Sequence, residues 1–473
     1  MSVRQRWRVA IVGGGITGLA AAVRLADRAP AGTEVTVYEQ SGALGGKLRT
    51  GELAGGPVEF GAESFLMRDP AGGESAAVTL VRRLGLAGDL AHPSVGQAAL
   101  AVDGGLRPIP GGTLVGVPGD LAKVAAVAEP AADADRDGGR PLLAPDADVP
   151  VGALVRARFG DAVTDRLVDP MLGGVYAGRA DDLSLATTMP ALARAARVEH
   201  TLLGAVRAAQ AAAPRAPGEP VFGTLVGGLS RLVEAAATAG GATIRRDAAV
   251  RELTPTATGW RLTVGPTRDP ELVDADAVLL AVPARPAARL LAGVADLAPW
   301  VATTVGALDY ASVALITLAL PRPELPALSG FLVPATEELL IKASTFLTTK
   351  WGHLARPDGL ALVRASVGRY GEEASLQVTG DDLVEVVHRE LSKVLGTPLP
   401  APVASHVQRW GGALPQYAPG HLDRVAAVRS AVRGTHPTLV LAGAGYDGVG
   451  IPVCVRSGET AAEEIIKALG GSA

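Results

Sequence analysis

"VAIVGGGITGLAAAVRL", residues 9–25, is an apolar run that three consecutive glycines interrupt before a helix-like pattern begins. Glycine is unfavourable in the interior of a strand or a helix, so three together indicate a backbone that another group must approach closely. The pattern predicts a strand over 8–12, a helix from Ile16 to about Arg28 and a second strand over 33–39. A strand, a helix and a strand in this order form the unit from which parallel sheets are built.

The spacing Gly13-x-Gly15-x-x-Gly18 is typical of a dinucleotide-binding turn. In such a turn the first glycine permits a tight bend, the second lets the backbone reach a pyrophosphate, and the third lets the helix pack on the strand. The amides and the dipole at the start of the helix stabilise the phosphate charge. Glu39 ends the second strand, where a carboxylate can accept hydrogen bonds from ribose hydroxyls. A pyrophosphate is therefore the expected ligand.

Two further glycine-rich segments decide which dinucleotide is expected. "YEQSGALGGKLRT", residues 38–50, places Gly45-Gly46 directly after the acidic residue, as flavoproteins with an extended FAD commonly do. "LAGAGYDGVGIPVCVRSGETAAEEI", residues 441–465, places glycines before a helix expected over 454–469. The dipole of that helix would stabilise negative charge on a reduced flavin ring. These segments favour FAD over a nicotinamide cofactor.

Composition and charge exclude several other classes of protein. The chain has 473 residues, 48% of them hydrophobic and 19% charged, which fits two or three globular domains. A net charge of −4 gives no basic field for nucleic acid. The single cysteine, Cys454, and the unpaired spacing of the histidines predict no disulfide and no metal site. The chain starts without an apolar signal core and has no apolar run of about 20 residues, which predicts a cytoplasmic protein and leaves peripheral membrane contact open.

The order of strand-like and helix-like segments predicts an α/β fold with a Rossmann-like FAD-binding domain and two insertions. The predicted FAD-binding domain is discontinuous and comprises residues 1–75, 221–300 and 405–473. Residues 76–220 are expected to form a mainly helical insertion, which could face a membrane or a partner, and 301–404 a mixed α/β substrate-binding domain. The segment 129–150, rich in Pro, Gly and Asp, is expected to be an exposed loop.

Beyond the glycine motifs, four stretches resemble the flavin-dependent porphyrinogen oxidases of haem biosynthesis, a branch of the amine-oxidase-like flavoproteins. They are "FGAESFL" (60–66), "DPMLGGVYAGRADDLSLATTMP" (169–190), "WGGALPQYAPGH" (410–421) and "AGYDGVGIPVCVRSGETAA" (444–462). The resemblance covers nearly the whole chain. The second and third stretches resemble most the Gram-positive bacterial enzymes that are associated with coproporphyrinogen III.

The resemblance implies which residues bind FAD. The cofactor should be noncovalent, because no cysteine stands near Ala413, where flavin-linked amine oxidases often tether the ring. Val250 would meet the adenine side through its backbone, and Trp410 would border the isoalloxazine ring. The complete implied set is Gly13, Gly15, Ile16, Thr17, Gly18, Glu39, Gln40, Lys47, Gly61, Ala62, Glu63, Ser64, Val250, Trp410, Ala444, Val449, Gly450 and Ile451.

The resemblance also implies a substrate side. The "GGVYAG" turn, with Gly174 and Tyr176, would line the macrocycle pocket, and the Gly174 carbonyl would accept a pyrrole N–H. Eukaryotic-type enzymes place a propionate-binding arginine where this chain has Ala98. Arg68 is therefore the expected propionate ligand, with Arg49 and Arg107 as further candidates, although each is also readily explained as a solvated surface cation. No catalytic acid or base is assigned.

The implied activity is the six-electron oxidation of coproporphyrinogen III to coproporphyrin III by FAD and O2, with release of three H2O2. Oxidation of protoporphyrinogen IX is the nearest alternative, followed by a flavin amine oxidase, a nonenzymatic protein with the FAD fold and a nicotinamide dehydrogenase. The expected partners are a porphyrinogen and O2. Contact with a downstream chelatase stays open, and no oligomeric state is assigned.

Overall fold

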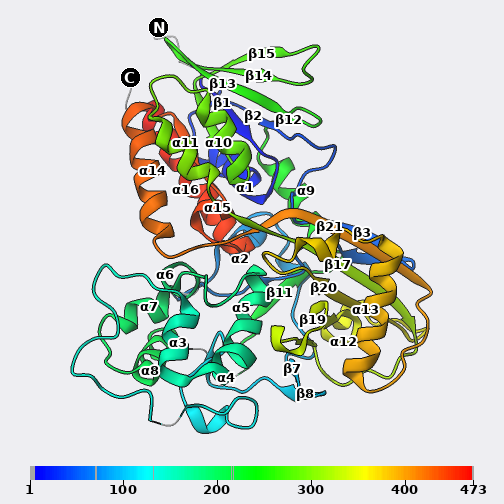
Figure 1. Cartoon of the computed structure of the whole chain (residues 1–473). Helices are drawn as coiled ribbons and strands as arrows, with labels where there is room; N and C mark the ends of the chain where they lie inside the picture. Colours follow the sequence, from blue (N-terminus) through cyan, green and yellow to red (C-terminus); the bar gives the residue numbers. More distant parts are fainter. Residues whose placement is uncertain (1–5, 70–71, 132, 215, 217, 471–473) are drawn as a thin grey trace.

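The computed structural model of the chain describes residues 6–69, 72–131, 133–214, 216 and 218–470. Figure 1 shows three parts: one that contains both ends of the chain, a mainly helical part, and a large sheet covered by a long helix. Segments coloured blue, green and red, which come from the beginning, the middle and the end of the chain, lie together in the first part. The chain therefore returns to this part after it has formed each of the other two.

The part with both chain ends is built on a five-stranded parallel sheet. Its strand order is β12 (Thr243–Arg245), β2 (Glu34–Tyr38), β1 (Arg8–Val12), β16 (Ala277–Leu280) and β22 (Leu439–Leu441). The last four residues of the central strand β1 are buried. A strand that is buried on both faces has a continuous apolar sequence, which is why 9–12 show no polar alternation. The predictions of this strand over 8–12 and of the helix after it are confirmed.

Alternate residues of these strands pack into two different cores. Ile11 and Leu279 contact α1 (Ile16–Arg28) and α16 (Ile451–Gly470) on one face. Val12 and Leu280 pack on the other face against three helices and a small antiparallel sheet. These elements are α10 (Ala284–Ala292), α11 (Pro299–Gly306), α14 (His421–Thr435), β13 (Val250–Thr256), β14 (Gly259–Val264) and β15 (Glu271–Ala275). Two more helices, α2 (Ala76–Arg83) and α9 (Ser230–Ala239), complete the layer that contains α1 and α16.

The helices α1 and α16 cross at Gly458, where a Cβ atom would lie 2.0 Å from the Thr17 carbonyl oxygen. Gly458→Ala should therefore push the helices apart and lower the free energy of unfolding by about 1–3 kcal/mol, measured by urea denaturation. Gly434→Ala is the matched control, because Gly434 also lies in a helix, α14, and its added Cβ would meet no atom within 4 Å. Equal unfolding midpoints for Gly458→Ala and the wild type would contradict this prediction.

The mainly helical part surrounds a second core that includes Phe159, Leu172 and Val206. It consists of α3 (Val151–Phe159), α4 (Asp161–Val163), a π-helical turn (Thr164–Val168), α5 (Asp169–Tyr176), α6 (Leu185–Thr188), α7 (Pro190–Ala196) and α8 (Leu202–Ala212).

The segment 129–150 has no regular structure where the structure describes it, but it is not simply an exposed loop. Leu143 is buried in the helical core. The Asp135 carboxylate accepts hydrogen bonds from the backbone amides of Leu202 and Leu203, at 2.8 and 2.9 Å, and so caps the start of α8. The prediction of an exposed loop is wrong at these points. Composition alone does not show that one acidic side chain accepts hydrogen bonds from the free amides at the start of a helix.

The third part is a seven-stranded, mostly antiparallel sheet with α13 (Gly380–Leu395) packed on one face. Its strand order is β21 (Ala404–Pro415), β17 (Tyr310–Pro321), β20 (Leu360–Val367), β19 (Ile341–Phe346), β18 (Gly330–Leu332), β7 (Ala99–Val102) and β8 (Gly105–Pro108). Two strands of this sheet, β7 and β8, come from the predicted helical insertion (76–220). A third, β21, comes almost wholly from the last predicted segment of the FAD-binding domain (405–473). The domain boundaries stay a prediction, and strand pairing between such distant segments has no local sequence signal.

The remaining regular elements are short. They are β3 (Thr50–Leu53), β4 (Gly56–Glu59), β5 (Phe65–Leu66), β6 (Leu90–Ala91), β9 (Thr113–Leu114), β10 (Val117–Pro118), β11 (Phe222–Leu225), α12 (Leu347–Lys350), α15 (Ala444–Asp447) and 3-10 turns at 87–89, 121–123, 335–337, 352–354 and 373–376. Within the part of the chain that the structure describes, no helix combines the length and apolarity that a membrane crossing requires.

Candidate cofactor and substrate site

The three glycines of the first turn have three different environments. Gly13 has a φ of 113°, and a Cβ atom there would lie 2.4 Å from the Ala281 carbonyl oxygen. A Cβ at Gly18 would lie 2.1 Å from the Gly13 oxygen, so helix and strand need glycine to pack at this distance. A Cβ at Gly15 would meet no atom within 4 Å. Gly13 and Gly18 are therefore required by the fold, whereas Gly15 leaves free a space that a ligand can use.

The start of α1 offers unpaired backbone amides beside this space. Gly15 is the N-cap residue, and no side chain caps the helix. The amides of Ile16, Thr17 and Gly18 belong to the first helical turn, which has no intrahelical acceptors for its N–H groups. The positive end of the helix dipole and these donors can stabilise a phosphate.

The second glycine pair lies directly against the first turn. The Gly45 amide donates to the Gly14 carbonyl at 2.8 Å, and Gly15 and Gly45 form an isolated parallel bridge. A Cβ at Gly46 would lie 3.5 Å from the Cα of Gly15. Lys47 follows this pair, and burial lowers the pKa of its ammonium group. The sequence prediction that the two glycine segments act on one ligand agrees with this contact.

Glu39 is held in a fixed orientation at the end of β2. One carboxylate oxygen accepts the Gly14 amide at 2.9 Å, and the other accepts the Ser41 amide and hydroxyl at 2.8 Å each. Gln40 is exposed beside it. Val250 begins β13 two residues after Ala248, whose amide donates to the Glu39 carbonyl at 2.9 Å. The residues implied for the ribose and adenine end thus lie close together.

The turn 61–64 meets the first part of the chain and the large sheet. A Cβ at Gly61 would lie 2.0 Å from the Lys47 carbonyl oxygen and 3.3 Å from Cζ2 of Trp410. The Ala62 amide donates to the same oxygen at 3.0 Å, and the Trp410 indole donates to the Phe60 carbonyl at 2.8 Å. The turn 61–64 thus contacts both the nearby glycine segment and Trp410, which lies about 350 residues further along the chain.

Glu63 is buried at this junction and is paired with two cations that the sequence analysis missed. Lys350 and Arg364 each donate to its carboxylate, and Arg364 also donates to the Gly61 carbonyl at 3.2 Å. Burial raises the pKa of Glu63, but the charges of Arg364 and Lys350 outweigh burial and lower it to about 2. The side chain of Glu63 thus fixes the turn 61–64 on the large sheet. A basic residue in a strand that is otherwise apolar was the available signal for Arg364.

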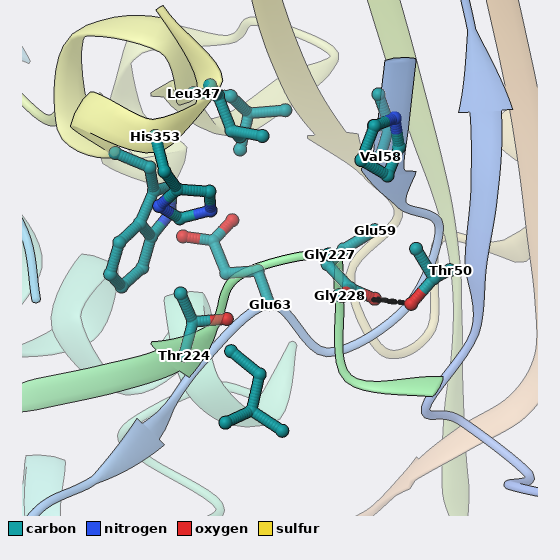
Figure 2. Close-up of a pocket in the computed structure, with 13 residues that line it drawn as sticks. Thr50, Val58, Glu59, Glu63, Thr224, Gly227, Gly228, Leu347 and His353 are labelled. Carbon is teal, nitrogen blue, oxygen red and sulfur yellow. Dashed lines mark hydrogen bonds between the residues drawn. The ribbon is translucent and has the colours of Figure 1, made fainter. Parts of the chain in front are cut away.

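A cavity of about 30 Å³ adjoins Glu63. Figure 2 shows the Glu63 carboxylate and the His353 ring at one side of it and the hydrogen bond between Thr50 and Glu59 at the other. A cavity of this size holds one or two water molecules and is far too small for a flavin or a porphyrin. The cavity is therefore a small gap in the packed interior next to the turn 61–64.

The C-terminal glycine loop is fixed next to α1 by a polar network. Arg429 binds both carboxylate oxygens of Asp447 at 2.7 Å each. Ser457 donates to Asp447 at 2.5 Å and accepts the Gly443 amide at 2.7 Å. A Cβ at Gly443 would lie 3.6 Å from the Thr17 hydroxyl oxygen. Ala444 is the first residue of α15, and its carbonyl accepts a hydrogen bond from the Tyr417 hydroxyl.

The second glycine-rich segment leads into a helix that packs against α1. Val449 and Gly450, with a φ of 108° at the glycine, lead directly into α16 at Ile451. The helix begins three residues earlier than the predicted position 454. Because α16 crosses α1 at Gly458, both glycine-rich helix starts that the sequence assigned to the cofactor belong to neighbouring helices.

The "GGVYAG" segment is not a turn, which corrects the sequence prediction. Gly174 and Tyr176 lie in the last turn of α5, and Ala177 caps this helix with a φ of 53°. Asp169 and Pro170 supply a favourable helix start, which outweighs the two glycines. The carbonyl of Gly174 is among the last four of the helix and has no intrahelical donor, so it remains able to accept a hydrogen bond.

The end of α5 packs beside the residue implied for the flavin ring. Ala177 forms one apolar cluster with Val313 and Ala413, and Trp410 packs against it. Burial raises the pKa of Tyr176 to about 12, so its hydroxyl is neutral at physiological pH.

The arginine predicted to bind propionate is already paired. Arg68 contacts Glu219 at 3.1 Å and donates to the Pro214 carbonyl at 2.9 Å. These partners lie in the segment between α8 and β11, and they compete with any propionate. Arg49 and Arg107 are exposed. Lys342, which is not among the predicted site residues, is a buried lysine in β19 whose ammonium donates to the Gly173 carbonyl of α5 at 3.2 Å.

The site fits FAD on three structural grounds. The space at Gly15 is free, the first turn of α1 has unpaired donors, and the Glu39 carboxylate is oriented at the strand end. The residues that would hold the cofactor are those of α1, β2, the 61–64 turn and the start of α16.

Comparison with known proteins agrees with this geometry. Residues 16–466 match the family described as flavin containing amine oxidoreductase. A Mycobacterium tuberculosis H37Rv protein named coproporphyrinogen III oxidase is 36% identical over 97% of both chains. A Bacillus subtilis protein of the same name is 30% identical over 97% of both chains.

A solved structure from Exiguobacterium sp. 255-15 is also similar. That protein is named for protoporphyrinogen oxidase activity. The two structures superpose with a TM-score of 0.83 at 31% identity, over 98% of this chain and 99% of the other. The extent of these matches and the geometry of the two helix starts establish that this chain belongs to the flavin containing amine oxidoreductase family.

Proposed function

We propose that the protein binds FAD noncovalently and uses O2 to oxidise coproporphyrinogen III to coproporphyrin III. The observation that carries the proposal is the position of the α5 end, where Ala177 belongs to the apolar cluster against which Trp410 packs and the Gly174 carbonyl has no intrahelical donor. Full-length relatives that bear the name coproporphyrinogen III oxidase support the choice of substrate.

When bound, FAD supplies an acceptor for two electrons, so a six-electron oxidation takes three cycles. The residues of this chain bind and orient the reactants. The α1 amides hold the pyrophosphate and Glu39 holds the ribose, while Trp410 limits the space beside the ring. The Gly174 carbonyl accepts a pyrrole N–H, which fixes one face of the macrocycle toward the cofactor.

Oxidation of protoporphyrinogen IX is the second candidate, and the name given to the Exiguobacterium protein favours it. The two substrates differ in two peripheral groups, which are propionates in one and vinyls in the other. The choice between them therefore depends on how the chain binds carboxylates.

The test gives the purified holoprotein coproporphyrinogen III and protoporphyrinogen IX in parallel and follows porphyrin fluorescence and O2 uptake. We expect a higher kcat/KM for coproporphyrinogen III, with about three O2 consumed per porphyrin formed. A higher value for protoporphyrinogen IX would select the second candidate. Rates no faster than spontaneous oxidation for both, with flavin still bound, would refute porphyrinogen oxidation.

A further inference from the structure

Lys342 lies at an irregularity of β19 that directs its side chain toward α5. The pairing of β19 with β20 shifts register between Ile341 and Ala343, so Lys342 is the extra residue of a β-bulge. Bulges re-aim side chains and are frequent beside active sites. Lys342 is 5% exposed, and its Nζ lies 3.2 Å from the Gly173 carbonyl oxygen.

The end of α5 joins Lys342 to the site already described. Gly174 faces Leu332 of β18, where an added Cβ would lie 3.1 Å from the leucine Cδ2. Ala177, one turn further, belongs to the apolar cluster against which Trp410 packs. The segment 173–177 therefore has the lysine ammonium at one end and the residue implied for the flavin ring at the other.

The charged groups near Lys342 are either cations or acids that already have other partners. Arg369 donates to the Val333 carbonyl at 3.4 Å, and the Val333 amide donates to the Lys342 carbonyl at 2.9 Å. Over the residues that the structure describes, no carboxylate lies within ion-pair distance of Lys342. The neighbouring acids are already engaged: Glu372 with Arg179 and Arg369, Asp169 with Arg179, and Glu390 with the amides of Leu340 and Ile341.

This environment makes the ammonium group a strong attractor for an anion. Burial, with the like charges of Arg369 and Arg364, lowers the pKa of Lys342 to about 7. A buried cation without a counter-ion is costly, and a carboxylate brought within hydrogen-bond distance would reduce that cost. Because Arg68 is paired with Glu219, Lys342 is the better-placed cation for this purpose beside the α5 end.

We propose that Lys342 binds a carboxylate of the substrate, one of the propionates of coproporphyrinogen III, and so contributes to substrate specificity. The inference rests on the proposed function. The macrocycle would lie against the α5 end, with a pyrrole N–H on the Gly174 carbonyl and one propionate on the Lys342 ammonium.

The test combines enzyme variants with a change in the substrate. Lys342→Met keeps the length of the side chain and removes its charge, Lys342→Arg keeps the charge, and Lys393→Met removes a lysine that is exposed on α13. Each variant is assayed with coproporphyrinogen III and with its uncharged tetraamide. We expect Lys342→Met to raise KM for the carboxylate substrate about ten- to a hundredfold with little change in kcat. The same variant should leave KM for the tetraamide within about twofold.

The pH dependence of kcat/KM distinguishes substrate binding by Lys342 from a purely structural role of this residue. In the wild type, kcat/KM for coproporphyrinogen III should fall as pH rises through about 7, because the free enzyme loses the ammonium charge there. This decline should be absent in Lys342→Met and shifted to much higher pH in Lys342→Arg. Flavin content and the urea midpoint of each variant show whether it folds.

Two results would overturn the inference. KM for coproporphyrinogen III that is unchanged in Lys342→Met would show that the lysine does not bind substrate. Equal losses with the carboxylate and the tetraamide would show that it only supports α5. If the wild type oxidises no porphyrinogen, the proposed function itself fails, and this outcome is distinct from both.

Discussion

Gly15→Ala is expected to weaken FAD binding about ten- to a hundredfold while the free energy of unfolding of the apoprotein stays unchanged. An alanine Cβ at this position meets no atom within 4 Å of the protein, and the backbone φ of −74° suits any residue. The added methyl group would, however, occupy the space where the pyrophosphate must approach the backbone. A steric conflict of about 1–3 kcal/mol corresponds to the expected loss in affinity.

The measurement is titration of the apoprotein with FAD, followed by flavin fluorescence, together with urea unfolding without cofactor. Two matched variants separate ligand contact from folding. Gly18→Ala places a Cβ 2.1 Å from the Gly13 oxygen and should destabilise the apoprotein, whereas Gly88→Ala meets no atom within 4 Å and should change neither property. Wild-type FAD affinity in Gly15→Ala would place the pyrophosphate elsewhere.

Glu63→Gln is expected to lower the free energy of unfolding by about 3–5 kcal/mol, because it leaves the Lys350 and Arg364 cations buried without their shared anion. Glu219→Gln is the matched control. Its partner Arg68 lies in a more exposed pair, whose loss should cost at most about 1 kcal/mol. Urea unfolding at pH 7 measures both variants, and similar midpoints for the two would contradict the prediction.

The pairing of Glu63 with Lys350 and Arg364 also predicts that the free energy of unfolding depends on pH. The folded pKa of Glu63, about 2, is below its ordinary value of 4.5, so the carboxylate stabilises the fold above pH 4.5. This contribution should be lost as pH falls from 4.5 to 2. The difference in unfolding free energy between the wild type and Glu63→Gln should therefore shrink over that interval.

Local patterns in the sequence were enough to predict the strand and the helix on either side of the first glycine turn. The first strand and α1 follow from an apolar run, a glycine turn and a helical period, all within 21 residues, and the structure confirms them. The contact between Gly45 and the first turn also has a local origin, because the glycine pair begins only seven residues after the end of β2. Short-range geometry determines these features.

The substrate side depends on contacts between distant segments and could not be predicted in the same way. The segment 173–178 is predicted to be a turn because of its glycines, but its first four residues complete a helix that has a favourable Asp-Pro start at 169–170. Arg68 seemed free because its partner Glu219 lies 151 residues away. Lys342 has no distinguishing local signal, because its position depends on a bulge and on a helix from another part of the chain.

An anaerobic titration of the holoprotein with coproporphyrinogen III tests whether this substrate reduces the bound flavin. Without O2, electrons from the substrate must remain on the bound flavin, whose absorbance near ~450 nm then disappears. We expect complete bleaching at about one third of a porphyrinogen per flavin, with coproporphyrin fluorescence increasing in parallel. Flavin that stays oxidised in excess coproporphyrinogen III would contradict this expectation.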